Sequence, residues 1–373
     1  MAESAIVFFL SSRRRDKREK YGMGIDRKQI VISAIGHEET SLCPYTFAWE
    51  PESDVDVRLD AYYGSDEWRS RFRNYIVRCA RAYDSGEFRR IGFDTYAAVE
   101  TDLYGSVWRT DRTPLHLEEP ALKGPSLGGY RFPDPDRFFP DGWEERVRSD
   151  IAENLDCFTV GYQGLGLFER AWAMRGFVEL LTDAAAEPAF FADLIAAVAD
   201  HQERLLDRVL AIPIDGMMFS DDWGDQRGVI IGPQRWRDVL KPHIGRSYAK
   251  AKSAGKFVLT HCCGSIADIL PDVIEIGLDV LESVQPEAEG MNPYKLKQLY
   301  GDKLTFWGGL GSQSIIPFGK PDELRKEIRK MAANMAKNGG YVLACAKALQ
   351  AETPTENAAV VLEEFIALGE QPA

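Results

Sequence analysis

From about residue 150 onwards, the chain alternates between short apolar runs and longer amphipathic stretches. Each apolar run has the length and the residue types of a buried β-strand, and each amphipathic stretch has helical spacing. Several of these stretches begin with proline, which is favoured in the first turn of a helix. Strands that alternate with helices of this length form parallel sheets covered by helices, so the pattern predicts an α/β fold.

The strands and helices of this alternation predict a (β/α)8 barrel, or TIM barrel, of about 280 residues. An open doubly wound sheet is less favoured because no G-x-G-x-x-G motif follows an early strand. The predicted strands are 91–93, Phe158–Tyr162, Gly216–Ser220, Phe257–Thr260, Val280–Val284, Leu304–Trp307 and Tyr341–Cys345, and the predicted helices are Pro188–Leu210, Pro233–Ala254, Ile266–Ile276 and Pro321–Asn338.

The residues before the barrel predict a helical N-terminal extension. The pattern from Asp26 to Ile35 predicts a helix capped by Asp26, and apolar residues at helical spacing predict a second helix over Trp68–Tyr83. Proline and glycine concentrate between Thr113 and Gly142, which predicts a long excursion over the surface. The expected organisation is a flexible leader over 1–25 and one domain over 26–373, with the helical layer at about 26–90 and the barrel at about 91–373.

The charge, the hydropathy and the cysteine count exclude several classes of protein. The chain has 45 Lys+Arg against 58 Asp+Glu, and the net charge of −13 opposes binding to nucleic acid or anionic lipid. It has no uninterrupted apolar window of about 18 residues, and its basic cluster at 13–18 follows the first apolar run, whereas a secretory signal has the opposite order. Six cysteines are too few for a disulfide scaffold. We therefore expect a cytoplasmic protein without nucleic acid or membrane partners, and a homodimer is left open.

Active-site groups of a TIM barrel come from the C-terminal ends of its strands, where this chain places a histidine and two cysteines. His261 and Cys263 follow one predicted strand, and Cys345 ends the last one. One imidazole and two thiolates are the three protein ligands of a catalytic zinc site, and sulfur ligands favour zinc over magnesium or manganese. Alternation along a strand sends His261 and Cys263 to the same side. Alternatively, the cysteines pack as small apolar side chains and the histidine is a hydrogen-bonded core residue.

Other strand ends supply candidate substrate-binding residues. The adjacent Asp221 and Asp222 have the carboxylates for acid/base chemistry or substrate binding, although one of them can instead cap the following helix. Aromatic residues at strand ends line an apolar pocket or fill the core. The candidate substrate-binding residues are Asp94, Tyr96, Asp221, Trp223 and Trp307.

Several segments resemble the uroporphyrinogen decarboxylase superfamily, and the resemblance extends from about residue 26 to the C-terminus. It implies a (β/α)8 barrel, in agreement with the alternation of strands and helices. The matching segments are FERAWAMRG (168–176), SDDWGDQRGVIIGPQRWRDVLKP (220–242), HCCGSIADILPDVIEIGLDVLESVQP (261–286), FWGGLGSQ (306–313), NGGYVLA (338–344) and TPTEN (353–357).

One branch of this superfamily comprises the decarboxylases, which work without metal or cofactor. They resemble one another in an arginine-rich N-terminal motif of the form RQAGRY, which the segment DRKQIVISAIGHEETSLCPYTF of this chain lacks. A polycarboxylate porphyrinogen needs such a cationic clamp, so its absence from a chain of net charge −13 argues against that substrate. The alternative function is a metal-independent decarboxylase of another carboxylated heterocycle, with Asp94 or Asp222 as the anchoring carboxylate.

A second branch comprises methyltransferases that act with corrinoid proteins, including the methylcobamide:coenzyme M methyltransferases. They carry zinc on a His-x-Cys…Cys set, which His261, Cys263 and Cys345 resemble. The resemblance implies a zinc enzyme that moves a methyl group, in either direction, between the corrinoid (cobalamin) of a partner protein and a thiol or methylated small molecule. It makes Asp222 and Gln285 candidate catalytic residues. Asp222 would orient the substrate or hydrogen-bond His261. Gln285 would support a metal ligand or act as a weak fourth ligand. A non-enzymatic tetrapyrrole-binding barrel is a third hypothesis.

Overall fold

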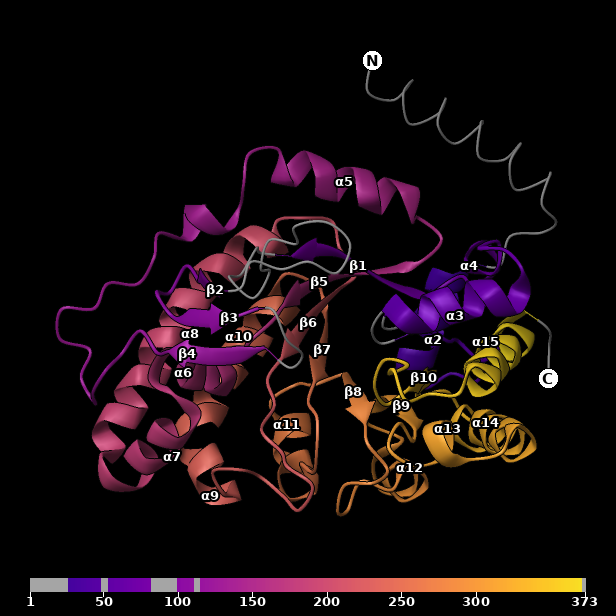
Figure 1. Cartoon of the computed structure of the whole chain (residues 1–373). Coiled ribbons are helices and arrows are strands. Elements are labelled where there is room, and N and C mark those ends of the chain that lie inside the picture. The colour runs from indigo at the N-terminus through magenta and orange to yellow at the C-terminus, as the bar shows by residue number, and fades with distance from the viewer. Residues whose placement is uncertain (1–25, 48–52, 82–98, 111–114, 371–373) are drawn as a thin grey trace.

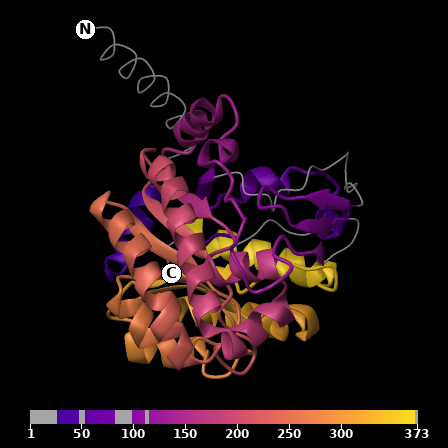
Figure 2. The ribbon, with the colours of Figure 1, turned by 90° about the vertical axis from the view of Figure 1, so that its left-hand side faces the viewer.

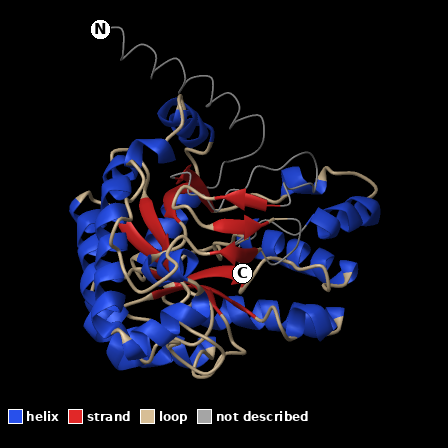
Figure 3. Cartoon of the chain, turned by 60° about the vertical axis from the view of Figure 1, so that its left-hand side comes forward, coloured by secondary structure: helices blue, strands red, loops and turns tan. Residues whose placement is uncertain are grey.

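The computed structural model describes residues 26–47, 53–81, 99–110 and 115–370. The expected leader at 1–25, the expected strand at 91–93 and the candidate residues Asp94 and Tyr96 lie outside these ranges. Seven parallel strands form the main sheet, in the order β1-β5-β6-β7-β8-β9-β10, with helices around it (Figures 1 and 3). The strands are β1 (Ile76–Arg81), β5 (Phe158–Gln163), β6 (Gly216–Ser220), β7 (Phe257–His261), β8 (Val280–Val284), β9 (Thr305–Leu310) and β10 (Tyr341–Cys345).

A short segment around Tyr45 lies between the two edge strands of this sheet. Tyr45 forms a parallel bridge with Leu343 of β10. Its carbonyl also accepts a hydrogen bond of 3.0 Å from the amide of Tyr75, which immediately precedes β1. The sheet therefore curls until its first and last strands flank the same segment, as a TIM barrel requires.

The helices that follow the strands were largely predicted by the sequence. Proline occupies the first turn of α8, α9, α12 and α14, as expected. Helices α8 and α10 pack side by side (Figure 2), and no helix in the described ranges is long and apolar enough to cross a membrane. The helices are α6 (Leu167–Arg175), α7 (Phe177–Ala186), α8 (Pro188–Leu210), α9 (Pro233–Arg235), the π-helical turn η2 (Trp236–Leu240), α10 (Lys241–Ser253), η3 (Ala267–Ile269), α11 (Leu270–Glu275), α12 (Pro293–Tyr300), α13 (Ile315–Phe318), α14 (Pro321–Met335) and α15 (Thr355–Glu370).

The N-terminal region confirms one predicted helix and corrects another. Helix α2 (Arg27–Ile35) begins after Asp26, whose side chain accepts a hydrogen bond from the Gln29 amide and caps the helix. The predicted helix over Trp68–Tyr83 is wrong: α4 (Trp68–Arg71) is a single turn, and β1 follows it. The apolar residues of the six-residue segment Ile76–Arg81 fit both the helical and the strand period. The pairing of this segment with β5 therefore decides its conformation. Helix α3 (Ser53–Tyr63) lies between α2 and α4 in the chain.

A second, antiparallel sheet was not predicted. It has the strand order β2-β3-β4, formed by β2 (Val99–Thr101), β3 (Val107–Arg109) and β4 (His116–Glu119). The predicted excursion at 113–142 thus includes β4 and the short helix η1 (Pro135–Phe138), before α5 (Trp143–Glu153) begins. His201 of α8 anchors this region, because its Nε2–H donates to the Pro133 carbonyl (2.9 Å) and its Nδ1 accepts from the Tyr104 hydroxyl (3.1 Å).

We expect this histidine to make the stability of the protein depend on pH. Burial, helped by Arg204 and Arg170, lowers the pKa of His201 below its usual value of 6.5. This histidine therefore binds a proton more readily in the unfolded chain than in the folded one. Its contribution to the free energy of unfolding is fully present above pH 6.5 and decreases as the pH falls through that value. The midpoint of thermal unfolding should decrease by about 1–3 °C between about pH 7.5 and about pH 5.5 because of this group.

Calorimetric scans of the wild-type protein and of His201→Gln over this pH range check the prediction. Glutamine keeps a donor for the Pro133 carbonyl but does not titrate, so this part of the pH profile should become flatter in the variant. An identical slope in the two proteins would contradict the assignment.

Candidate metal centre

The strand register defines which side chains face the interior of the main sheet. His261 of β7 pairs with Glu282 of β8, and Glu282 pairs with Trp307 of β9. Because laterally paired residues point to the same face of a sheet, these three side chains share a face. The Arg78 guanidinium of β1 lies 5.9 Å from the centroid of the Trp307 ring, although β1 and β9 are not neighbours in the strand order. A contact between such distant strands identifies this face as the concave interior.

Three potential metal ligands meet at the C-terminal ends of β6 and β7. The Nε2 atom of His261 lies 3.4 Å from the Cys263 Sγ and 3.5 Å from an Asp222 carboxylate oxygen. One ligand atom from each residue lies within 4.8 Å of the other two. The Cys263 amide donates a hydrogen bond of 2.8 Å to the Asp222 carboxylate, which fixes the two residues relative to one another. We call His261, Cys263 and Asp222 the His–Cys–Asp cluster.

A buried carboxylate forms a hydrogen bond with the imidazole of this cluster. Nδ1–H of His261 donates to Oε2 of Glu282, so Nε2 is the nitrogen that faces Cys263 and Asp222. Burial by itself lowers the pKa of His261, but the Glu282 carboxylate and Cys263 outweigh it and raise the pKa well above 6.5. Glu282 is fully buried, and its Oε1 atom has no hydrogen-bond partner among the described residues.

These residues fit a bound zinc ion. Zinc accepts imidazole nitrogen, thiolate sulfur and carboxylate oxygen, and catalytic sites use three protein ligands and keep one position open. Histidine ligands of zinc commonly donate their other N–H to a carboxylate, as His261 does to Glu282. A buried carboxylate oxygen without a partner is costly unless positive charge lies nearby, and a metal ion beside His261 would supply that charge.

Glu169 of α6 extends the site and was not predicted. Burial raises the pKa of the Glu169 carboxyl well above its usual 4.5, with further contributions from the Asp222 and Asp221 carboxylates. His261 and a hydrogen bond from the Asp222 amide act in the opposite direction. The carboxyl group of Glu169 therefore lies next to the His–Cys–Asp cluster, on the first turn of the helix that follows β5.

Asp221 has a different environment from its neighbour Asp222. Its carboxylate accepts hydrogen bonds from the amides of Phe168 (3.0 Å) and Glu169 (2.8 Å), and so caps the N-terminus of α6. It also accepts one from the Trp223 indole nitrogen (2.7 Å). Burial raises the pKa of Asp221 to about 6 despite these donors. The structure thus uses Asp221 as a helix cap and buries Trp223 against it, and it brings neither residue to the His–Cys–Asp cluster.

Gln285 and Ser283 hold the backbone around Cys263. The Gln285 side-chain oxygen accepts a hydrogen bond of 2.7 Å from the Gly264 amide. Ser283 has a φ of 67°, which a residue other than glycine rarely adopts, and its hydroxyl donates to the Ala346 carbonyl at 2.7 Å. The Ser283 hydroxyl lies 3.8 Å from the Cys263 Sγ. Gln285 therefore supports the loop that carries Cys263.

The structure does not bring Cys345 to the cluster. Within β10, Val342 pairs with Trp307 and therefore faces the interior, whereas Cys345, three residues later, faces the opposite side. Burial raises the pKa of the Cys345 thiol to about 12. Cys345 is thus a buried thiol on the outer face of the sheet, and the third potential ligand beside His261 and Cys263 is Asp222.

We expect the Glu282 carboxylate to strengthen metal binding through His261. A Glu282→Gln variant keeps the shape and an acceptor for Nδ1–H but removes the charge, so its metal affinity should fall by about 10–100-fold. Competition with a chelator measures this affinity. Glu203→Gln, which alters an exposed ion pair with Arg246, is the control and should keep the wild-type affinity. Equal affinities in the Glu282→Gln variant and the wild type would contradict the role.

Comparison with known proteins places the chain in a family. A sequence profile of the uroporphyrinogen decarboxylase (URO-D) family matches residues 168–367, which is more than half of the chain. The chain therefore belongs to the uroporphyrinogen decarboxylase family of TIM-barrel enzymes, which confirms the resemblance inferred from the sequence. No curated protein matches the chain significantly.

One solved structure shows the same fold over nearly the whole chain. A methyltransferase from Methanosarcina mazei has a TM-score of 0.62 at 15% sequence identity, over 91% of this chain and 98% of that one. A 3-keto-D-glucoside 4-epimerase from E. coli has a TM-score of 0.36 at 15% identity, over 60% of this chain and 83% of that one. The similarity to the methyltransferase extends over nearly the whole of both chains.

Proposed function

We propose that the protein is a zinc-dependent methyltransferase that moves a methyl group between a corrinoid protein and a thiol or methylated small molecule. The observation that carries this proposal is the His–Cys–Asp cluster at the C-terminal ends of β6 and β7, with the Glu282 carboxylate behind the imidazole. The nearly full-length similarity of fold to a methyltransferase supports it. When bound there, zinc would supply a Lewis acid that lowers the pKa of a coordinated thiol and makes it nucleophilic near neutral pH.

The residues of the chain prepare this site for the metal and for the substrate. Glu282 fixes the orientation of His261, and the Cys263 amide fixes the Asp222 carboxylate. Both sets of contacts are made within the chain itself and hold the ligand atoms together, so little reorganisation is needed when they close around a cation. With one thiolate and one carboxylate in the ligand set, the two anionic ligands would balance the charge of a divalent metal ion, and the fourth position would remain open for a substrate sulfur.

The interior walls next to the cluster keep the reacting groups away from water. Trp307 is 1% exposed and Tyr162 is 6% exposed, and both belong to the interior face. Exclusion of water strengthens electrostatic interactions at the site and protects a reactive methyl group from hydrolysis. The C-terminal ends of the strands, where TIM barrels bind their substrates, form the side from which a corrinoid protein would approach.

Metal analysis tests this proposal most directly. Protein purified, supplied with zinc and dialysed should retain about one zinc ion per chain. It should then consume methylcobalamin in the presence of a thiol and form the methyl thioether, as measured by absorbance and mass spectrometry. A zinc-supplied protein without stoichiometric metal would overturn the proposal. Release of carbon dioxide from a carboxylated heterocycle by metal-free protein would support the decarboxylase alternative instead.

A further inference from the structure

Two buried polar atoms on the interior face of the main sheet have no hydrogen-bond partner among the described residues. They are the Oε1 atom of Glu282 and the indole Nε1 atom of Trp307. Glu282 is 0% exposed and Trp307 is 1% exposed. Buried polar atoms of folded proteins are nearly always hydrogen-bonded, because an unpaired one costs stability. Two such atoms level with His261 therefore indicate a place for a ligand.

The strand register places these two side chains next to one another. Glu282 of β8 pairs with Trp307 of β9 on one side and with His261 of β7 on the other. Neighbouring strands lie about 4.8 Å apart, so a small group between the two side chains can contact both. The carboxylate oxygen is a hydrogen-bond acceptor and the indole nitrogen is a donor. We call Glu282 Oε1 and Trp307 Nε1 the donor–acceptor pair.

The neighbouring groups leave the donor–acceptor pair unsatisfied. His261 donates to the other oxygen of Glu282, Oε2. A metal ion at the His–Cys–Asp cluster would offset the charge of the Glu282 carboxylate, but it has no hydrogen to donate to Oε1. The Arg78 guanidinium lies 5.9 Å from the centroid of the Trp307 ring and has only donors, so it cannot accept from the indole N–H.

An unpartnered indole by itself does not identify a binding site. Trp236 of η2 is also 0% exposed, and its Nε1 atom also has no partner among the described residues. It lies in the helical layer, where its ring packs against that of Trp223 with 5.3 Å between the centroids. Trp307 differs because an unpartnered carboxylate oxygen belongs to the residue paired with it, on the same face of the sheet.

We infer that the donor–acceptor pair is a hydroxyl subsite, and that the substrate of the cluster carries a hydroxyl group in addition to its sulfur or methylated atom. A hydroxyl oxygen accepts a hydrogen bond from Trp307 and its hydrogen is donated to Glu282, so one group satisfies both atoms. A carboxylate cannot donate to Glu282, and an ammonium group cannot accept from Trp307. This inference rests on the proposed function and specifies the class of its substrate.

Thiols that differ in one hydroxyl group test the inference. The probes are 2-mercaptoethanol, 3-mercapto-1-propanol and 4-mercapto-1-butanol, each compared with the alkanethiol in which a methyl group replaces the hydroxyl. They are titrated into cobalt(II)-loaded protein, whose absorption spectrum reports sulfur coordination. We expect the best of the three hydroxythiols to bind about 10–100-fold more tightly than its alkanethiol, because it donates a hydrogen bond to a charged group.

Trp307→Phe removes the donor of the pair and keeps an aromatic ring. The preference for the hydroxythiol should fall by about 3–10-fold, the contribution of one neutral hydrogen bond. The alkanethiol should still bind, which also shows that the variant is folded. Trp236→Phe is the matched control, since it removes an equally buried, unpartnered indole N–H outside the interior and should keep the preference. An undiminished preference in Trp307→Phe would overturn the subsite.

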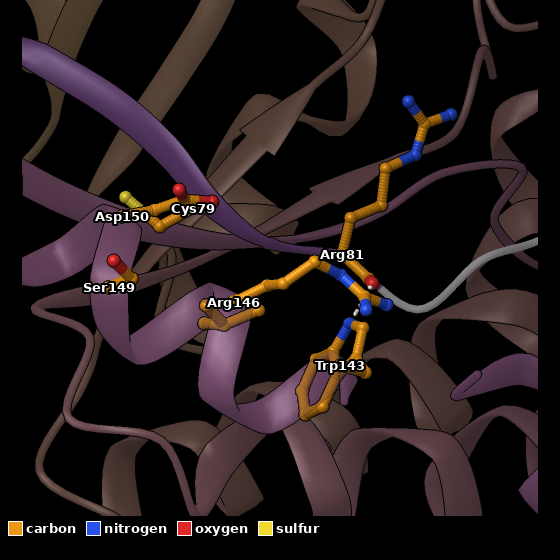
Figure 4. A pocket seen from close by; sticks show the side chains of 7 residues that line it. Cys79, Arg81, Trp143, Arg146, Ser149 and Asp150 are labelled. Carbon is orange, nitrogen blue, oxygen red and sulfur yellow. Dashed lines mark hydrogen bonds between the residues drawn. The ribbon is translucent and has the colours of Figure 1, made fainter. Parts of the chain in front are cut away.

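Trp143→Phe is a second control. Trp143 lies on α5, where it lines a cavity of about 260 Å³ beside β1 and its indole donates to the Arg81 carbonyl at 2.7 Å (Figure 4). A thiol bound in this cavity leaves the cobalt spectrum unchanged, so the variant should keep the preference. Equal binding of hydroxythiols and alkanethiols to the wild-type protein would overturn the hydroxyl subsite but leave the proposed function intact. No spectral change with any thiol would overturn the proposed function itself.

Discussion

A Cys263→Ser variant is expected to lose its bound metal, whereas a Cys345→Ser variant is expected to keep it. Cys263 contributes the thiolate sulfur of the His–Cys–Asp cluster, 3.4 Å from the Nε2 of His261. Cys345 faces the other side of β10 and is buried there. Removing a directly bound thiolate should cost more affinity than the ~10–100-fold expected for the loss of a group that only supports a ligand.

Zinc measured by inductively coupled plasma mass spectrometry after dialysis, together with chelator competition, distinguishes the two variants. Thermal unfolding of both variants controls for loss of structure. His261→Ala and Asp222→Asn should resemble Cys263→Ser in metal content. Loss of zinc from Cys345→Ser in a folded protein would instead restore the ligand set first expected from the sequence, and it would require β10 to twist that side chain inward.

An Asp102→Asn substitution is expected to destabilise the protein by about 3–5 kcal/mol, because it leaves a buried guanidinium without its carboxylate. The Arg170 and Asp102 side chains are 0% and 1% exposed and form an ion pair of 3.2 Å. The same carboxylate accepts hydrogen bonds from the Ser106 amide (2.8 Å) and the Trp108 indole (3.0 Å). The Arg170 guanidinium also lies 4.0 Å from the ring centroid of Tyr104. This network attaches the antiparallel sheet to α6, the helix that carries Glu169.

Urea unfolding at neutral pH measures this loss. The control is Glu144→Gln, which removes an exposed ion pair with Arg148 on one helix and should change the stability by less than about 1 kcal/mol. The double variant Asp102→Leu/Arg170→Leu should recover part of the stability, since it leaves neither buried charge unpaired. A single variant as stable as the wild type would show that the ion pair contributes little to folding.

The strands of the main sheet were the most predictable part of the fold. The bounds of β6, β8 and β10 agree with the sequence prediction, because continuous apolar runs bounded by polar residues are specific for strands buried on both faces. Strand β1 was missed because its sequence IVRCAR contains two charged residues. The segment around Tyr45 was missed because its pairing depends on residues distant in the sequence.

The candidate metal site was predictable only in part. Alternation along the chain correctly placed Cys263 beside His261, although β7 ends at His261, because the two residues are only two positions apart. Position at a strand end does not reveal which face a residue occupies, so Cys345 was assigned to the site although its register with Leu310 directs it outward. The sequence analysis assigned no role to Glu282 or Glu169. Glu169 reaches the site from a helix, whereas the candidate residues were taken from strand ends.

The position of Tyr45 between β1 and β10 has a consequence for biosynthesis. One neighbour, Tyr75, leaves the ribosome soon after it, but the other, Leu343, follows almost three hundred residues later. At a synthesis rate of about 5–20 residues per second, the backbone edge that pairs with β10 has no partner strand for roughly 15–60 seconds. Pro44 precedes Tyr45 and has no amide hydrogen to offer a foreign strand. Pro44 thus limits pairing with a foreign strand at the backbone edge that waits longest for its native partner.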